Sequence, residues 1–194
     1  AGVGWWKEEF SALDAPFKDR GLATDEYIQI FKLLWDSDIS EFHGETYDFS
    51  NIAFFPKPVQ EPNGIPIWIG GHTKRAIKRT VKYGNAWHPT RLKPSQIENM
   101  LPYLAQQCEK YDRQVDDITL SLKRTLHFTD IGLDTNNKTR SQAALIDSTI
   151  EIIEDIKQCQ NLGIKHLTFD FQTSDTNDCI RIMEHLMETD TKII

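Results

Sequence analysis

The later two-thirds of the chain alternates short apolar stretches with longer amphipathic ones, and this alternation limits the possible folds more than any other feature. The run Ile65–Ile69 (IPIWI) is continuously apolar, as expected of a strand buried on both faces of a parallel sheet. Thr73 is a suitable N-cap for the helix that follows. Gly84 is a suitable end for that helix after Tyr83. The pattern therefore predicts a complete strand–turn–helix unit.

The same unit recurs three more times. The expected strands cover residues 85–89, 118–128 and 165–171, and the expected helices cover residues 95–111, 149–161 and 177–188. Pro102 lies inside the first of these helices and is expected to kink it. Residues 129–142 are polar and predict a loop. Because strands that alternate with helices pair in parallel through right-handed crossovers, the sequence predicts an α/β fold.

The first third of the chain is organised differently. Residues 25–35 form an amphipathic pattern, with Thr24 as the expected N-cap. Gly44 separates two short aromatic-rich stretches, which predicts a β-hairpin before the strand at Ile65. The chain opens on GVGW at residues 2–5, which has the character of the exit from a strand. We therefore expect further strands in front of it.

Composition argues against several classes of protein. The chain has 194 residues and a net charge of -7, so a nucleic-acid-binding face is not expected. No apolar run approaches the roughly 20 residues that span a bilayer, and we expect a soluble, cytoplasmic protein with no membrane partner. The three cysteines lack CxxC spacing and lie in helical patterns, which predicts free thiols. The histidines show neither HxxxH nor HxH spacing, so no metal site is expected.

The strongest local signal for ligand binding is Gly70–Thr73 (GGHT), followed by Lys74 and Arg75. In parallel α/β folds, ligands bind where strands end and helices begin. Two glycines let a phosphate approach backbone N–H groups, and the helix N-terminus favours an anion. The alternative is a tight turn followed by a helix whose basic side chains face solvent. The residues alone leave both interpretations open.

A histidine and several tryptophans also lie at expected strand ends. His88 is a candidate catalytic residue, because a histidine in this position can polarise a carbonyl group or move a proton. The alternative is an imidazole whose hydrogen bonds are satisfied by loop backbone. Four tryptophans either pack in the core or line a site for a flat heteroaromatic ring: Trp5, Trp6, Trp68 and Trp87.

Several short motifs occur in order along the first half of the chain. They are GVGWWKEEF at residues 2–10, the helix at 25–35, GETY at 44–47, PKPVQ at 56–60, PIWIGG at 66–71 and GNAW at 84–87. Together they resemble the luciferase-like monooxygenase family, and within it the branch that uses the deazaflavin coenzyme F-420. The resemblance implies a partial TIM (β/α)8 barrel from the end of strand 4 to helix 8, with a hairpin excursion before strand 5. It also implies one luciferase-like domain over residues 1–194 that is incomplete at its N-terminus.

The same resemblance implies a flavin- or deazaflavin-dependent oxidoreductase or monooxygenase that acts on a small molecule. The implied cofactor is coenzyme F-420 or FMN, the implied reaction is hydride transfer or oxygen insertion, and we expect a homodimer. The implied cofactor-binding residues are those of the strand exit, the glycine turn and the strand before His88, namely Gly2, Val3, Gly4, Trp5, Gly70, Gly71, His72, Thr73 and Trp87.

Two other functions stay open on the sequence alone. The first is a non-catalytic half-barrel that self-associates and only binds flavin, because an open half-barrel exposes strand edges and apolar flanks. The second is a phosphosugar-binding barrel fragment without a redox role. Binding of flavin but not of sugar phosphates would argue against the second.

Overall fold

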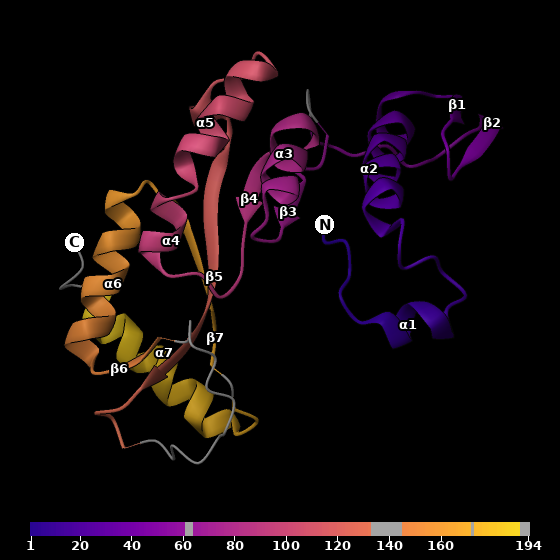
Figure 1. Ribbon diagram of the computed structural model, residues 1–194. Helices are drawn as coiled ribbons and strands as arrows, with labels where there is room; N and C mark the ends of the chain where they lie inside the picture. Colours follow the sequence, from indigo (N-terminus) through magenta and orange to yellow (C-terminus); the bar gives the residue numbers. More distant parts are fainter. Residues whose placement is uncertain (61–63, 133–144, 172, 191–194) are drawn as a thin grey trace.

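A parallel sheet forms the centre of the fold (Figure 1). The computed structural model describes residues 1–60, 64–132, 145–171 and 173–190. The sheet strands are β3 (Trp68–Gly70), β4 (Ala86–His88), β5 (Thr119–Phe128), β6 (Leu145–Asp147) and β7 (His166–Asp170). β3 pairs with β4, β4 with β5, and β5 with both β6 and β7, all in parallel. The predicted α/β fold with a parallel sheet is confirmed.

β5 is the longest strand, and its two faces differ in polarity. Its even-numbered residues are all buried, and they are Leu120, Leu122, Arg124, Leu126 and Phe128. Its odd-numbered residues are polar, and they are Thr119, Ser121, Lys123, Thr125 and His127. The register pairs Ser121 with His166 and Thr125 with Asp170, so polar side chains of β7 share a face with those of β5. One face of the sheet is therefore mainly apolar core, with Arg124 paired to Asp155 as its charged exception, and the other face carries polar side chains.

Helices cover the apolar face of the sheet. The main core joins Trp87 of β4 to residues from α3 (Lys74–Tyr83), α5 (Leu101–Lys110) and α6 (Thr149–Asn161). On α3 the buried residues Ile77 and Val81 are four apart, as helical periodicity requires. A second cluster joins β5 and α6 to α7 (Thr176–Asp190), and consists of Leu126, Phe128, Ile152, Ile156 and Ile182.

The helix predicted over residues 95–111 is interrupted. The structure has α4 (Pro94–Glu98) and then α5, which begins at Leu101, and a short 3-10 helix, η1 (Val115–Asp117), follows. In a continuous helix residue 102 would donate its N–H to the carbonyl of Glu98, and Pro102 has no N–H. Pro102 lies instead in the first turn of α5, where an N–H has no partner in the helix. The predicted kink is thus a complete break.

The N-terminal third contains α1 (Lys7–Ala12), α2 (Arg20–Asp36) and a hairpin of β1 (Ser40–His43) and β2 (Asp48–Ile52). The hairpin predicted around Gly44 is confirmed. The prediction that Thr24 caps α2 was wrong, because the helix already begins at Arg20. The Thr24 hydroxyl instead donates to the Arg20 carbonyl at 2.7 Å, inside the helix.

A buried carboxylate attaches the hairpin to α2. Glu26 accepts backbone N–H bonds from Glu45 at 2.7 Å and from Thr46 and Tyr47 at 3.0 Å each. A Cβ at Gly44 would lie 2.6 Å from Cδ of Glu26, so the turn leaves no room for a side chain there. Glu26 therefore fixes the position of the hairpin on the helix.

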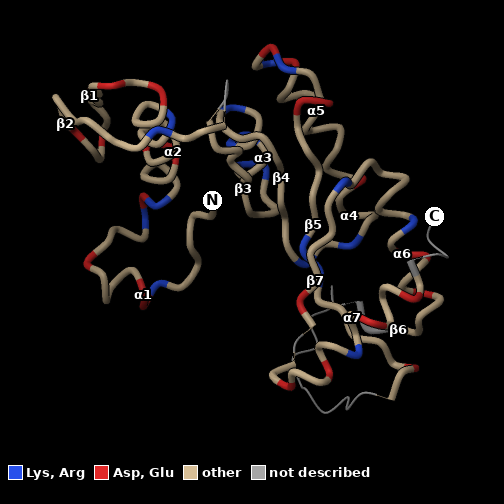
Figure 2. The backbone as a smooth tube through the Cα atoms, turned by 180° about the vertical axis from the view of Figure 1, so that it is seen from behind, with Lys and Arg blue, Asp and Glu red and all other residues tan. Residues whose placement is uncertain are grey.

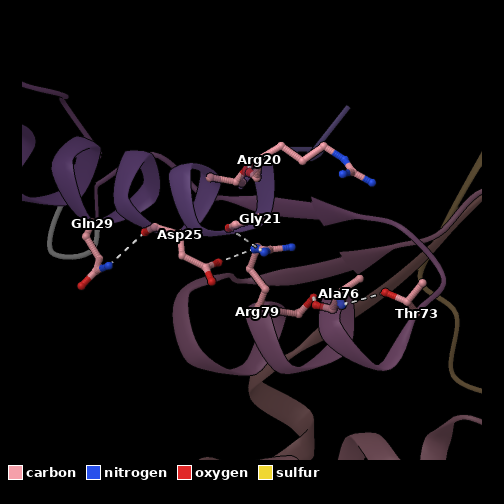
Figure 3. Close-up of polar contacts among 9 residues, drawn as sticks. Arg20, Gly21, Asp25, Gln29, Thr73, Ala76 and Arg79 are labelled. Carbon is pink, nitrogen blue, oxygen red and sulfur yellow. Dashed lines mark hydrogen bonds and ion pairs between the residues drawn. The ribbon is translucent and has the colours of Figure 1, made fainter. Parts of the chain in front are cut away.

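An ion pair connects α2 to α3 (Figure 3). The Arg79 guanidinium binds the Asp25 carboxylate, and its Nη2 donates to the Gly21 carbonyl at 3.0 Å. Lys and Arg are frequent on α3 (Figure 2), and among them Arg79 binds α2 directly. The N-terminal third thus packs against the helix that follows the glycine turn.

Most remaining elements agree with the sequence. Ser148 precedes α6, and Glu151 accepts from both its N–H and its hydroxyl, at 3.1 and 2.7 Å. β6 was not predicted from the sequence. The predicted loop over residues 129–142 lies outside the described residues from 133 onward. In the part of the chain that the structure describes, no helix has the length and apolar character needed to cross a membrane.

The three cysteines are free, as predicted. Cys108 and Cys159 are buried and Cys179 is partly buried. Burial raises the pKa of the Cys159 thiol to about 12, so this group is uncharged and inert at neutral pH.

Candidate functional site

The glycine turn lies between the end of β3 and the start of α3. Gly71 has φ +110°, a conformation that L-residues rarely adopt, and a Cβ there would lie 3.1 Å from Cβ of Ala76. Thr73 caps the helix by accepting the N–H of Ala76 at 3.3 Å, as predicted. Gly70 and Gly71 therefore leave bare backbone directly in front of a helix N-terminus.

The first turn of α3 carries positive charge and no acidic residue. His72, Lys74 and Arg75 are exposed there, and Nζ of Lys74 lies 5.1 Å from the centre of the Tyr103 ring. Farther along α3, Arg79 is occupied by its ion pair with α2. The basic residues are therefore not one uniform solvated face, and those nearest the helix N-terminus are the ones available to an anion.

Trp87 supports the glycine turn from the core. Its side chain is 1% exposed, and its indole N–H donates to the Gly71 carbonyl at 2.8 Å. Beside it, Asn85 accepts the N–H of Ile67 through its side-chain oxygen at 2.8 Å. The structure thus places Trp87 as a positioning residue under the turn and not as an exposed wall for a ring.

The first residue lies beside β3. The amino group of Ala1 donates to the Trp68 carbonyl at 2.5 Å, and the Ala1 carbonyl accepts the N–H of Gly70 at 2.7 Å. These two bonds to residues on either side of Ile69 are the pattern of a parallel pair. Gly2 therefore leaves the sheet at the same edge as the glycine turn, as a strand exit would.

A cavity of about 350 Å³ opens at the carboxyl ends of the strands. We call it the rim cavity, and its lining residues are Trp5, Thr90, Arg91, Lys123, Thr125 and Asp170. Thr90 follows β4 and forms a parallel bridge with Lys123. Nζ of Lys123 lies 3.3 Å from a carboxylate oxygen of Asp170. Three strands thus contribute side chains or flanking residues to this single cavity.

His88 is held by the neighbouring strand. Its Nδ1 lies 2.8 Å from the Ser121 hydroxyl, which donates to the His166 carbonyl at 3.1 Å. Because the hydroxyl proton is used there, Nδ1 of His88 carries the proton of this bond. Burial, the charge of Lys123 and the N-terminal ammonium lower the pKa of His88, so the imidazole is neutral at neutral pH. A side chain, and not loop backbone, satisfies this histidine.

The segment Gly2–Gly4 lines a second, mainly apolar cavity of about 410 Å³. Residues from α1, α2 and the hairpin complete it, among them Phe10, Phe31 and Tyr47. Trp5 turns away to the rim cavity and is 84% exposed. The structure therefore separates Gly2, Val3 and Gly4 from the cavity that Trp5 lines.

Several residues of the rim cavity were not singled out from the sequence. Lys123 and Thr125 are examples, and the signal that pointed to them is the polar odd-numbered face of the strand at 118–128. Within residues 1–60, 64–132, 145–171 and 173–190, no three His, Cys, Asp or Glu side chains gather closely enough to hold a metal ion.

Comparison with known proteins identifies the family. A profile of the luciferase-like monooxygenases matches residues 1–177. The chain belongs to the luciferase-like monooxygenase family. The chain is 33% identical over 100 residues to an uncharacterised protein of Mycobacterium tuberculosis, covering 52% of this chain and 33% of that protein. It is 28% identical over 134 residues to the FMNH(2)-dependent dimethylsulfone monooxygenase of Pseudomonas putida, covering 68% of this chain and 33% of the enzyme.

Solved structures of luciferase-like enzymes share this fold. An F420-dependent secondary alcohol dehydrogenase superposes with a TM-score of 0.70 at 16% identity, covering 91% of this chain and 64% of that one. The coenzyme F420-dependent tetrahydromethanopterin reductase of Methanopyrus kandleri gives a TM-score of 0.69 at 14% identity, with 94% and 70% coverage. The luciferase-like chain described here corresponds to about a third of the length of the curated relatives it matches.

Proposed function

We propose that this luciferase-like chain is part of a flavin- or deazaflavin-dependent oxidoreductase and holds the phosphate of FMN or coenzyme F-420 at its glycine turn. The observation that carries the proposal is the bare, left-handed backbone at Gly71 in front of the N-terminus of α3. The cofactors named in the relatives, FMNH2 and F420, support a phosphate-bearing flavin or deazaflavin.

The residues present fit a phosphate. Gly70 and Gly71 leave the backbone accessible, while Thr73 uses its hydroxyl to satisfy Ala76 and leaves earlier N–H groups of the helix free for an anion. Lys74 and Arg75 add positive charge to the same turn. Trp87 keeps the Gly71 carbonyl directed into the core, away from the anion. The bound cofactor supplies the redox chemistry, namely hydride transfer or activation of oxygen.

We further propose that His88 serves as a proton acceptor for a small-molecule substrate. Its Nδ1–H is used by Ser121, which leaves Nε2 as the basic nitrogen of a neutral imidazole. The lowered pKa of His88 keeps this nitrogen unprotonated at neutral pH, which is the state that a base requires.

The proposed architecture is the second half of a TIM barrel, with β3, β4, β5 and β7 as its fifth to eighth strands. The parallel order β3-β4-β5, with β7 on β5, supports this assignment. In such barrels the active site lies at the carboxyl ends of the strands, which is where the glycine turn and the rim cavity lie. The active site of such a barrel uses residues from several strands. We therefore propose catalysis for the whole protein and cofactor binding for this chain.

The test is a titration of FMN, riboflavin and coenzyme F-420 into the chain, followed by fluorescence anisotropy of each ligand. We expect FMN to bind at least about tenfold more tightly than riboflavin, because only FMN carries a phosphate. The double variant K74A/R75A should lose most of this preference. K78A, which removes an exposed charge beyond the first turn, should keep it. Failure of FMN and coenzyme F-420 alike to bind would refute the proposal.

A second candidate function is self-association without catalysis. The aromatic side chains of Tyr27 and Phe31 on α2 are 43% and 46% exposed, and Trp5 and Trp6 are also exposed. Such groups favour a partner surface, which here would be a second copy of the chain. Light scattering distinguishes the cases, since a monodisperse monomer at high concentration contradicts the homodimer.

A further inference from the structure

We propose that the rim cavity binds a small organic anion through Arg91, so that the substrate of the proposed oxidoreductase carries a carboxylate or a similar oxyanion. The role as substrate rests on the proposed function. The binding itself depends only on residues of this chain and needs no cofactor. None of the residues that line the rim cavity belongs to the glycine turn, so the anion site and the phosphate site are separate.

The backbone of Arg91 is the first observation. Arg91 has φ +59°, in the left-handed region where glycine or asparagine is favoured over a long side chain. Its N–H donates to the Lys123 carbonyl at 3.0 Å, and the N–H of Lys123 donates to the Pro89 carbonyl at 3.0 Å. These bonds fix the strained residue against β5. Arginine is disfavoured in this conformation, yet an arginine occupies it at the edge of a cavity. This points to a function for the Arg91 side chain.

The charge of the rim cavity is the second observation. Its lining contains two cations, Arg91 and Lys123, and one anion, Asp170, so it has an excess of one positive charge. Lys123 and Asp170 form an ion pair with each other at 3.3 Å. Among the ion pairs of the described residues there is none that involves Arg91. The guanidinium is therefore the group that an incoming oxyanion would meet, in the fork geometry that suits a carboxylate.

The remaining lining suits the rest of such a ligand. Thr90 and Thr125 offer hydroxyl groups that can donate to an oxyanion. Trp5 presents an exposed aromatic face to the carbon skeleton. A volume of about 350 Å³ suits a small organic molecule and is at the lower end of the range for ligand pockets.

The experiment is a calorimetric titration of the cofactor-free chain with benzoate, benzamide and inorganic phosphate. Benzoate and benzamide have nearly the same shape, and only benzoate is charged. We expect benzoate to bind at least about tenfold more tightly than benzamide, since the neutral amide loses the ion-pair attraction to the guanidinium and offers one oxygen acceptor in place of two. Equal affinities would overturn the proposal. A phosphate affinity that exceeds the benzoate affinity and is lost in R91G would also overturn it, because the rim cavity would then serve a phosphate.

Two variants locate the site. R91G places glycine in a conformation that glycine favours, so we expect its melting temperature to be equal to or above that of the parent while its benzoate affinity falls about tenfold. K93Q removes one positive charge two residues away and should retain the benzoate affinity. Unchanged benzoate binding by R91G would overturn the proposal. Failure of the cofactor titration with intact benzoate binding would refute the proposed function and leave the anion site standing.

Discussion

Replacing Gly71 with alanine tests whether the left-handed backbone of the glycine turn is essential. At φ +110° an alanine is strained by about 1–3 kcal/mol. Its Cβ would also lie 3.1 Å from Cβ of Ala76, so the helix start must shift slightly. Reduced freedom of the unfolded chain offsets about 0.4–1 kcal/mol of this cost. We therefore expect G71A to lower the free energy of unfolding by about 1–2 kcal/mol, which for a chain of this size lowers the melting temperature by roughly 2–8 °C.

Gly70 provides the matched control in the same turn. Its φ is not positive, and a Cβ there would meet its nearest neighbour, the Ala1 carbonyl oxygen, at 3.4 Å, an ordinary contact. G70A should therefore change the free energy of unfolding by less than about 0.5 kcal/mol. The added methyl group would nevertheless occupy the accessible backbone proposed to hold the phosphate. We expect weaker FMN binding from G70A without loss of stability.

Urea unfolding followed by tryptophan fluorescence measures the stability difference, and FMN anisotropy measures binding. A G71A variant as stable as the parent would show that the left-handed conformation is not required. A G70A variant with the FMN affinity of the parent would show that the phosphate does not approach this backbone. The G71A result tests the conformation of the glycine turn, and the G70A result tests phosphate binding by its backbone.

Three further predictions concern neighbouring contacts. W87F should lower the free energy of unfolding by about 2–3 kcal/mol in urea unfolding, because it leaves the Gly71 carbonyl without its indole partner and a void in the core. E26Q should release the hairpin, which hydrogen exchange would detect as faster exchange of its turn amides, while the sheet amides stay protected. The hydrogen bond to the Asp48 carboxylate raises the pKa of His43, so the stability that this contact adds to the β1–β2 hairpin is fully present below the unfolded pKa and is lost as pH rises through the folded pKa. NMR titration should show this raised pKa, and D48N should lower it.

The sequence predicted those parts of the fold that are encoded by a few adjacent residues. The unit from Trp68 to Gly84 is one example, because an apolar run, a capping Thr73 and a terminal glycine all act locally. The start of α2 was missed, since its first turn contains Gly21 and continues the polar segment before it. The break before α5 arises because Pro102 lies in the first turn of a new helix and not inside one continuous helix. The local sequence is compatible with both arrangements.

The candidate site was predictable only in part, for the same reason. The glycine turn is a local motif and was recognised directly. The rim cavity combines Arg91, Lys123 and Asp170, which are far apart in the chain and meet only through the register of three strands. Tertiary contact also decides the role of Trp87, because the sequence pattern around a tryptophan at a strand end is the same whether its side chain points into the core or into a cleft.

The bond between Trp87 and Gly71 has a practical consequence for spectroscopy. The indole proton of Trp87 is donated to the carbonyl of the residue whose backbone we propose as part of the phosphate site, yet the ring itself is buried and does not touch solvent. Its indole resonance, one of five tryptophan indole signals expected in a nitrogen-15 correlation spectrum, should therefore shift when an anion occupies the turn, and W87F identifies it by its loss. The chain thus contains an intrinsic reporter of occupancy that requires no label on the cofactor.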